Sequence, residues 1–103
     1  MATGILAQSA PSAATNTTVY TVTAGKTASI TVSFLNQTSG MIAVRLAIAA
    51  SGTPTTSEYL EYDAIIPANS VLERGGLVAT ATKNIVVYTS AAGASVSVYG
   101  YEE

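Results

Sequence analysis

The sequence predicts an all-β fold, an antiparallel β-sandwich of seven to eight strands with either an immunoglobulin-like or a jelly-roll topology. Apolar and polar residues alternate in several short stretches, which is the pattern of strands buried on one face. Gly, Pro or Asn separates these stretches at the spacing of roughly 8–12 residues that is typical of sandwiches and barrels. No stretch shows a sustained helical period, and a chain of 103 residues suits a single domain with one core.

Residues 41–50, MIAVRLAIAA, are the best candidate for a central strand. Large β-forming residues alternate along one side, whereas the other side holds alanines around Arg45. Residues 27–36 alternate as cleanly, with apolar residues on one face and mostly hydroxyl side chains on the other. We expect the core to contain Ile30, Val32, Phe34, Ile42, Val44, Leu46, Ile48 and Val87.

The remaining strands are shorter or less regular. They are expected at residues 17–22, 58–66, 70–78, 85–89 and 94–101. Arg74, Gly75 and Gly76 interrupt the segment 70–78, so we expect a bulge or a turn there. In the last segment, alternation places the valines inward and Tyr99 and Tyr101 outward.

The first fifteen residues differ in composition from the rest of the chain. Ala, Ser and Thr dominate residues 1–15, so we expect a flexible N-terminal arm followed by a β-sandwich domain at residues 16–103. Ile5 and Leu6 are the only large apolar pair in this arm, which makes them candidates to anchor it on a neighbouring subunit. The arm is a poor signal peptide, and no apolar run approaches the ~20 residues that span a bilayer.

The residue types exclude several classes of chemistry. Cysteine and histidine are both absent, which removes thiolate and imidazole metal ligands and any Ser–His pair. The basic residues Lys26, Arg45, Arg74 and Lys83 are scattered, so no basic patch for nucleic acid is expected. We therefore expect no enzymatic activity, no cofactor, no metal, and no nucleic-acid or membrane partner.

Glu58, Glu61 and Asp63 form the one acidic cluster. Such a cluster could bind Ca²⁺ or supply a glycosidase pair, but no calcium-binding loop surrounds it. Strict alternation places Glu61 and Asp63 on one face, together with Tyr59, and Tyr62 on the other. We interpret the segment as a solvated or subunit-facing strand. Arg45 is then a partner of Asp63 or Glu61, an intersubunit contact, or a surface side chain.

The chain has unusually few charges. Charged residues make up 10% of the sequence, against about 25% in an ordinary domain. This composition suits a surface that other subunits cover, although a Thr- and Ser-rich β-domain accounts for it equally well. The outward tyrosines suit an interface or a stacked sugar. The possible interface residues are Ile5, Leu6, Arg45, Tyr59, Tyr99 and Tyr101.

Several segments occur in an order that resembles a group of small structural proteins of tailed bacteriophages. In those proteins a Y-T-V-x-A-G-K opening, an L/E-Y-D strand, an I-P-A-N turn and a closing V-x-G-x-E recur in this order. The matching segments here are VYTVTAGKTASITVSFLN (19–36), AVRLAIAASG (43–52), EYLEYDAIIPANSVLERGGLVA (58–79), IVVYTS (85–90) and VSVYGYEE (96–103). Lys83 and Asn84 depart from the family pattern, which affects the expected shape of the turn before the strand at residues 85–89.

The resemblance implies a virion component, most simply a capsid decoration (cement) protein that binds the outer capsid as a homo-oligomer. Its partners would be copies of itself, as a trimer by the symmetry of capsid lattice points, and the major capsid protein or other virion proteins. It would be assembled in the bacterial cytoplasm and located in the virion. A neck, tail or head-fibre subunit is the first alternative. A carbohydrate-binding β-sandwich module is the second, although the chain contains no Trp.

Overall fold

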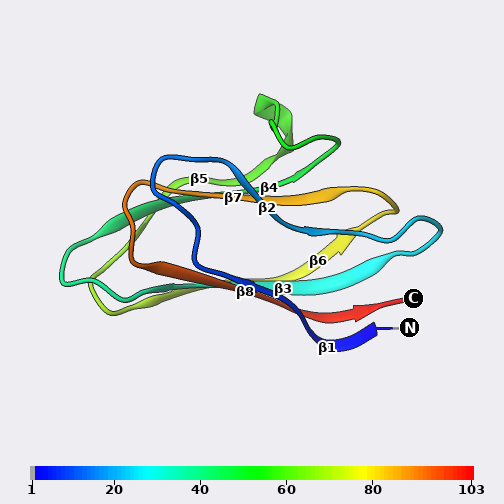
Figure 1. The fold of residues 1–103 in the computed structure, drawn as a ribbon, viewed down its shortest axis with the longest axis horizontal. Coiled ribbons are helices and arrows are strands. Elements are labelled where there is room, and N and C mark those ends of the chain that lie inside the picture. The colour runs from blue at the N-terminus through cyan, green and yellow to red at the C-terminus, as the bar shows by residue number, and fades with distance from the viewer. Residues whose placement is uncertain (1) are drawn as a thin grey trace.

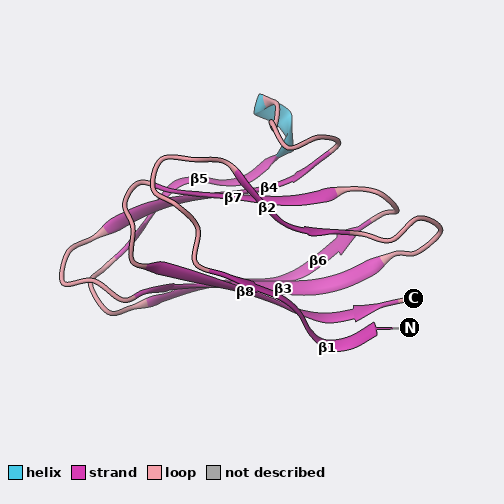
Figure 2. Cartoon of the chain, in the orientation of Figure 1, coloured by secondary structure: helices cyan, strands magenta, loops and turns pink. Residues whose placement is uncertain are grey.

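The computed structural model describes residues 2–103, which form two packed layers of β-strands (Figure 1). The strands are β1 (Ala2–Ser9), β2 (Thr17–Thr21), β3 (Ala28–Asn36), β4 (Ile42–Ala49), β5 (Tyr59–Ile66), β6 (Val71–Ala79), β7 (Asn84–Thr89) and β8 (Ala94–Glu102). Figure 2 shows one turn of 3-10 helix, η1 (Thr56–Glu58), in the loop before β5. Among residues 2–103, no helix is long and apolar enough to cross a membrane.

Each layer is a four-stranded antiparallel sheet. Sheet 1 has the order β1-β8-β3-β6, and sheet 2 has the order β2-β7-β4-β5. The pairs β1–β8, β2–β7, β3–β6 and β4–β5 are nested, as if one long hairpin had been rolled up. Only the connection from β4 to β5 stays within one sheet. The predicted sandwich is therefore confirmed, and of the two topologies left open it is the jelly roll.

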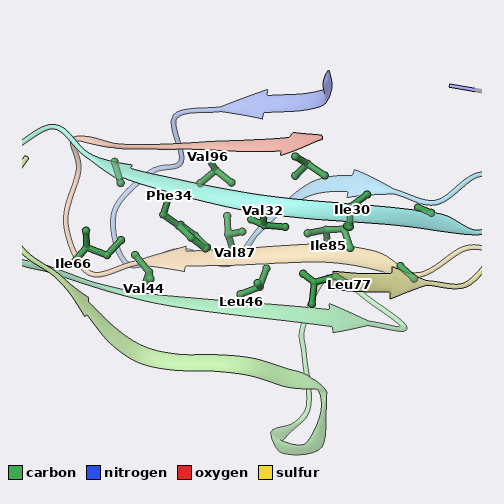
Figure 3. Packing of buried hydrophobic residues seen from close by; sticks show 14 of the residues in the cluster. Ile30, Val32, Phe34, Val44, Leu46, Ile66, Leu77, Ile85, Val87 and Val96 are labelled. Carbon is green, nitrogen blue, oxygen red and sulfur yellow. The ribbon is translucent and has the colours of Figure 1, made fainter. Parts of the chain in front are cut away.

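The core lies between the two sheets (Figure 3). Phe34 and Val32 from β3 face Val44 and Leu46 from β4, and these side chains have no exposed surface. All the predicted core residues are buried except Ile48, which is only partly buried. Its position follows from irregular pairing near Leu46, where both Leu46 and the next residue are buried.

The N-terminal segment differs from the prediction of a flexible arm over residues 1–15. Residues 2–9 form β1, which pairs along its length with β8 at the edge of sheet 1. The sequence did not indicate this strand because Ala and Gly have weak β-propensity, so the strand depends on its pairing with β8. Met1 lies outside the described residues.

The interruption at Gly75 and Gly76 is a bulge within a continuous β6. Val32 of β3 pairs with Arg74 and Ile30 pairs with Leu77, so two residues of β6, Gly75 and Gly76, lie opposite the single residue Thr31. Gly76 has a φ of +71°, which glycine adopts without steric cost. The bulge leaves Leu77 buried and Val78 exposed on the outer face.

Two side-chain pairs link the sheets at the open sides of the sandwich. Arg74 of β6 forms an ion pair with Glu61 of β5 and also donates to the Leu60 carbonyl oxygen. On the opposite side, the Tyr20 hydroxyl of β2 donates to the buried Glu102 carboxylate of β8. Each pair therefore joins one strand of sheet 1 to one strand of sheet 2.

Candidate functional site

The outer face of sheet 1 carries large apolar side chains in the open. Cross-strand pairing places Ile5 opposite Tyr99, and Tyr101 between Thr3 and Ser29. Ile5 is 58% exposed, Val78 is 61% exposed and Tyr101 is 44% exposed. We call this surface the sheet 1 face, which consists of Ile5, Ser29, Thr31, Val78, Tyr99 and Tyr101.

A shallow hollow of about 340 Å³ lies in the sheet 1 face. Tyr99 and Tyr101 border it on β8, and Gly76 and Val78 border it on β6. Gly100 allows β8 and β3 to approach closely here, because a Cβ atom at this position would lie 2.1 Å from the Ser29 carbonyl oxygen. Glycines of two strands, Gly76 of β6 and Gly100 of β8, thus line the hollow.

The sheet 1 face is nearly free of charge. Among the described outward positions that pair across this sheet, Glu73 is the one charged side chain. Its carboxylate accepts a hydrogen bond of 2.7 Å from the Tyr99 hydroxyl, and this bond raises the pKa of Tyr99. An uncharged, hydroxyl-rich surface with exposed aromatic and aliphatic groups loses little on desolvation, so it suits protein contact.

The outer face of sheet 2 carries a different arrangement, centred on Arg45 of β4. The Arg45 guanidinium lies between two aromatic rings, 4.2 Å from the centroid of Tyr62 and 4.3 Å from that of Tyr88. Its Nε atom donates a 2.6 Å hydrogen bond to Asp63 Oδ1, and this bond raises the pKa of Arg45. Of the roles considered for Arg45, the structure shows the ion pair with Asp63.

A bulge in β5 creates this arrangement. Val44 pairs with Ala64 and Leu46 pairs with Glu61, so Tyr62 and Asp63 both lie opposite Arg45. Asp63 has a φ of +55°, a left-handed conformation that Asp tolerates better than most residues. The predicted facing, with Tyr62 on the opposite side from Asp63, is therefore wrong. Glu61 is directed instead to Arg74.

An aromatic groove of about 390 Å³ adjoins this arrangement. Pro54, Thr56, Tyr59 and Tyr62 line it, and we call it the tyrosine groove. The Tyr59 and Tyr62 rings meet edge to face, with centroids 5.0 Å apart and an interplanar angle of 86°. In Figure 1, the loop that carries η1 projects from sheet 2 on the side away from sheet 1.

Glu58 fixes the loop that forms one wall of the tyrosine groove. Its carboxylate accepts hydrogen bonds from the Thr55 N–H at 2.8 Å and from the Ala50 N–H at 3.0 Å. These bonds lower the pKa of Glu58. The three acids of the predicted cluster thus have three separate partners. Within the described part of the chain, no group of three or more His, Cys, Asp or Glu residues could hold a metal ion.

The predicted interface residues fall into three places. Ile5, Tyr99 and Tyr101 lie together on the sheet 1 face, as the pairing of β1 with β8 requires. Arg45 and Tyr59 lie on the outer side of sheet 2, while Leu6 packs against the core of its own chain. Sequence reasoning missed three surface residues, Tyr62, Tyr88 and Val78. No sequence pattern signalled the bulge in β5 that places Tyr62 beside Arg45. In β6, the sequence did not distinguish a bulge before Val78 from a turn.

Comparisons of the chain with protein-family models, curated proteins and solved structures give no match. The class that the structure defines is a jelly-roll β-sandwich with two separate candidate interaction surfaces, one on the outer side of each sheet.

Proposed function

We propose that the protein is a non-enzymatic structural component of a tailed-phage virion, which binds the outer capsid surface as a homo-oligomer. The sequence motifs over residues 19–103 support the phage assignment. The observation that carries the binding role is the sheet 1 face, where Ile5, Val78 and Tyr101 are exposed on a nearly uncharged surface. Exposed apolar groups clustered in this way are typical of surfaces that other proteins cover.

The dimensions of the whole outer side of sheet 1, to which the sheet 1 face belongs, fit this role. Strands β3, β6 and β8 each have nine residues, so the sheet is about 30 Å long and, with four strands, about 19 Å wide. These dimensions give about 570 Å² in projection, and side-chain relief raises the accessible area. A standard protein interface covers about 800 Å² on each partner, so this one face supplies most of a stable contact.

A trimer follows from the symmetry of capsid lattice points and from the family resemblance. In this proposal the sheet 1 face contacts either a second copy of the chain or the capsid protein, and the bound state covers the exposed apolar groups. A low net charge of −2 imposes little repulsion between copies at physiological ionic strength.

The test is a comparison of two matched variants. Val78→Asp places a charge on the sheet 1 face, whereas Ile65→Asp places the same charge on sheet 2. Both positions are highly exposed, at 61% and 55%, and both lie on edge strands. We expect Val78→Asp to abolish self-association in sedimentation or binding to purified capsids, whichever contact the sheet 1 face makes, and Ile65→Asp to leave both unchanged.

The copy number in purified virions distinguishes the location. Hundreds of copies per particle would support a decoration protein, and a dozen or fewer would indicate the neck, tail or head-fibre alternative. A monomer at high concentration that is also absent from purified particles would refute the proposal.

A further inference from the structure

We propose that the tyrosine groove binds a neutral pyranose ring of a glycan. Its walls are the aromatic side chains Tyr59 and Tyr62 together with Pro54 and Thr56. The volume of about 390 Å³ lies near the lower end of the 300–1,000 Å³ range of ligand pockets, which suits a mono- or disaccharide unit. This binding activity is separate from the virion role and does not depend on it.

The groove is held in shape before any ligand arrives. Tyr62 is fixed from one side by the Arg45 guanidinium, which Asp63 orients in turn, and Tyr59 contacts the Tyr62 ring edge to face. The opposite wall is fixed by Glu58 through its hydrogen bonds to backbone N–H groups. A preformed site of this kind avoids much of the entropic cost of ordering side chains on binding.

The chemistry of the walls selects a ligand with one apolar face and a polar rim. Tyrosine rings present a flat apolar surface with a hydroxyl at one end, which matches the C–H face and the hydroxyls of a pyranose. Thr56 supplies a hydroxyl in the groove itself, which can donate to or accept from a sugar hydroxyl.

The charges around the groove favour a neutral ligand. Arg45 and Asp63 compensate each other in an ion pair, and the Glu58 carboxylate is engaged by two backbone N–H groups. No uncompensated positive charge therefore faces a phosphate or carboxylate ligand from these residues. Because both carboxylates are engaged, neither is free beside the tyrosine rings to attract a cationic ligand.

The location of the tyrosine groove leaves it accessible in the proposed assembly. Its lining residue Thr56 belongs to η1, whose loop projects from sheet 2 on the side away from sheet 1 (Figure 1), whereas the sheet 1 face belongs to the other layer. A subunit attached through the sheet 1 face therefore presents the groove to the surroundings. The two surfaces share no residue, so the glycan site can be tested on the isolated protein.

The test is a titration of the ¹⁵N-labelled full chain, followed by amide chemical shifts. The probes are methyl β-D-glucopyranoside, methyl β-D-galactopyranoside, methyl α-D-mannopyranoside and lactose, with sorbitol as an open-chain control. We expect at least one glycoside to cause saturable shifts at Thr56, Tyr59 and Tyr62, with a dissociation constant of about 1 mM. Sorbitol offers hydroxyl groups on an open chain without a rigid ring face, so it should cause no saturable shift.

Two variants separate the groove from a general effect. Tyr62→Ala removes the exposed aromatic wall and should weaken binding by about tenfold or more, while its spectrum shows whether the fold is kept. Tyr101→Ala removes a tyrosine of the sheet 1 face and should leave the affinity unchanged. The proposal is overturned if every probe fails to saturate up to about 50 mM, where a 1 mM site would be filled. Equal binding of sorbitol, or of the Tyr62→Ala variant, would overturn it too.

Discussion

Asn36 is the side chain whose removal should be most informative about how the jelly roll is closed at one end. It lies at the end of β3 and is completely buried. Its amide nitrogen donates to the carbonyl oxygens of Gly40, Ile66 and Pro67, at 2.8, 3.0 and 3.1 Å. Its amide oxygen accepts from the N–H and hydroxyl groups of Thr38, at 2.9 and 2.7 Å. Asn36 thereby joins the loop after β3 to the turn after β5.

The expected cost of Asn36→Ala follows from these contacts. An amide has two N–H donors, so three carbonyl partners mean that one donor is shared. Two donated and two accepted hydrogen bonds are lost, each with a net value of about 1 kcal/mol. We expect a loss of about 3–4 kcal/mol, which is a large part of the ~5–15 kcal/mol that stabilises a domain of this size.

Asn36→Asp tests the hydrogen-bond donors at nearly constant shape. The introduced carboxylate faces three carbonyl oxygens, so its folded-state pKa is raised above the unfolded value of about 3.9. Protons are then bound more tightly in the folded state, and stability falls as the pH rises from the unfolded pKa through the folded pKa. At pH 7 the variant should be at least as unstable as Asn36→Ala, and it should recover part of that loss near pH 4.

Urea unfolding followed by circular dichroism measures both effects. The matched control is Asn69→Asp, because Asn69 lies in the turn after β5 that Asn36 contacts, is exposed and has a φ of +55° that Asp tolerates. We expect the control to change the free energy of unfolding by less than about 0.5 kcal/mol. If Asn36→Asp behaved like this control at pH 7, the buried amide network would not stabilise the fold, and the reasoning would be refuted.

Two further predictions concern the core and the loop. Phe34→Ala should cost about 3–5 kcal/mol in urea unfolding because Phe34 is fully buried between the sheets, and a loss below about 1 kcal/mol would contradict the assigned facing. Glu58→Gln removes an acid whose folded pKa is lowered, so its stabilising effect is present at neutral pH and is lost as the pH falls through the folded pKa. The variant should therefore melt below the wild type at pH 7 and approach it in acid, and a constant difference in melting temperature at all pH values would contradict the role of the carboxylate.

Sequence periodicity predicted the facing of β3 and β8 because nothing interrupts the alternation of these two strands on the core side. In β3 and β8 every second residue is buried from Ala28 to Asn36 and from Ala94 to Val98. Phe34 and Val96 therefore face the core as predicted. Such strands pack between two neighbours, so burial alone fixes which face is apolar.

Periodicity failed where the chain departs from a flat strand. The bulge at Asp63, which has a left-handed backbone conformation, adds one residue to β5. The residues that precede Asp63 in β5 therefore face the side opposite to the one that strict alternation predicts, and Tyr62 lies on the side of Arg45. A period-two pattern cannot detect such a residue, because composition permits the bulge without requiring it. Strand β1 failed for another reason: its pairing with β8 involves residues that are distant in sequence and weak in propensity.

The nested pairing of the jelly roll determines which parts of the chain can form a joint surface. Because β1 pairs with β8, the two ends of the chain lie side by side in sheet 1, as Figure 1 shows for the N- and C-termini. Half of the sheet 1 face, namely Ile5, Tyr99 and Tyr101, therefore comes from the first and last strands. The tyrosine groove is built from the middle of the chain, around the single connection that stays within one sheet, from β4 to β5. Since bulges re-aim side chains without changing the pairing order, each surface can vary while the other is kept. A loss of self-association with glycan binding retained, or the reverse, is thus a result that this topology permits.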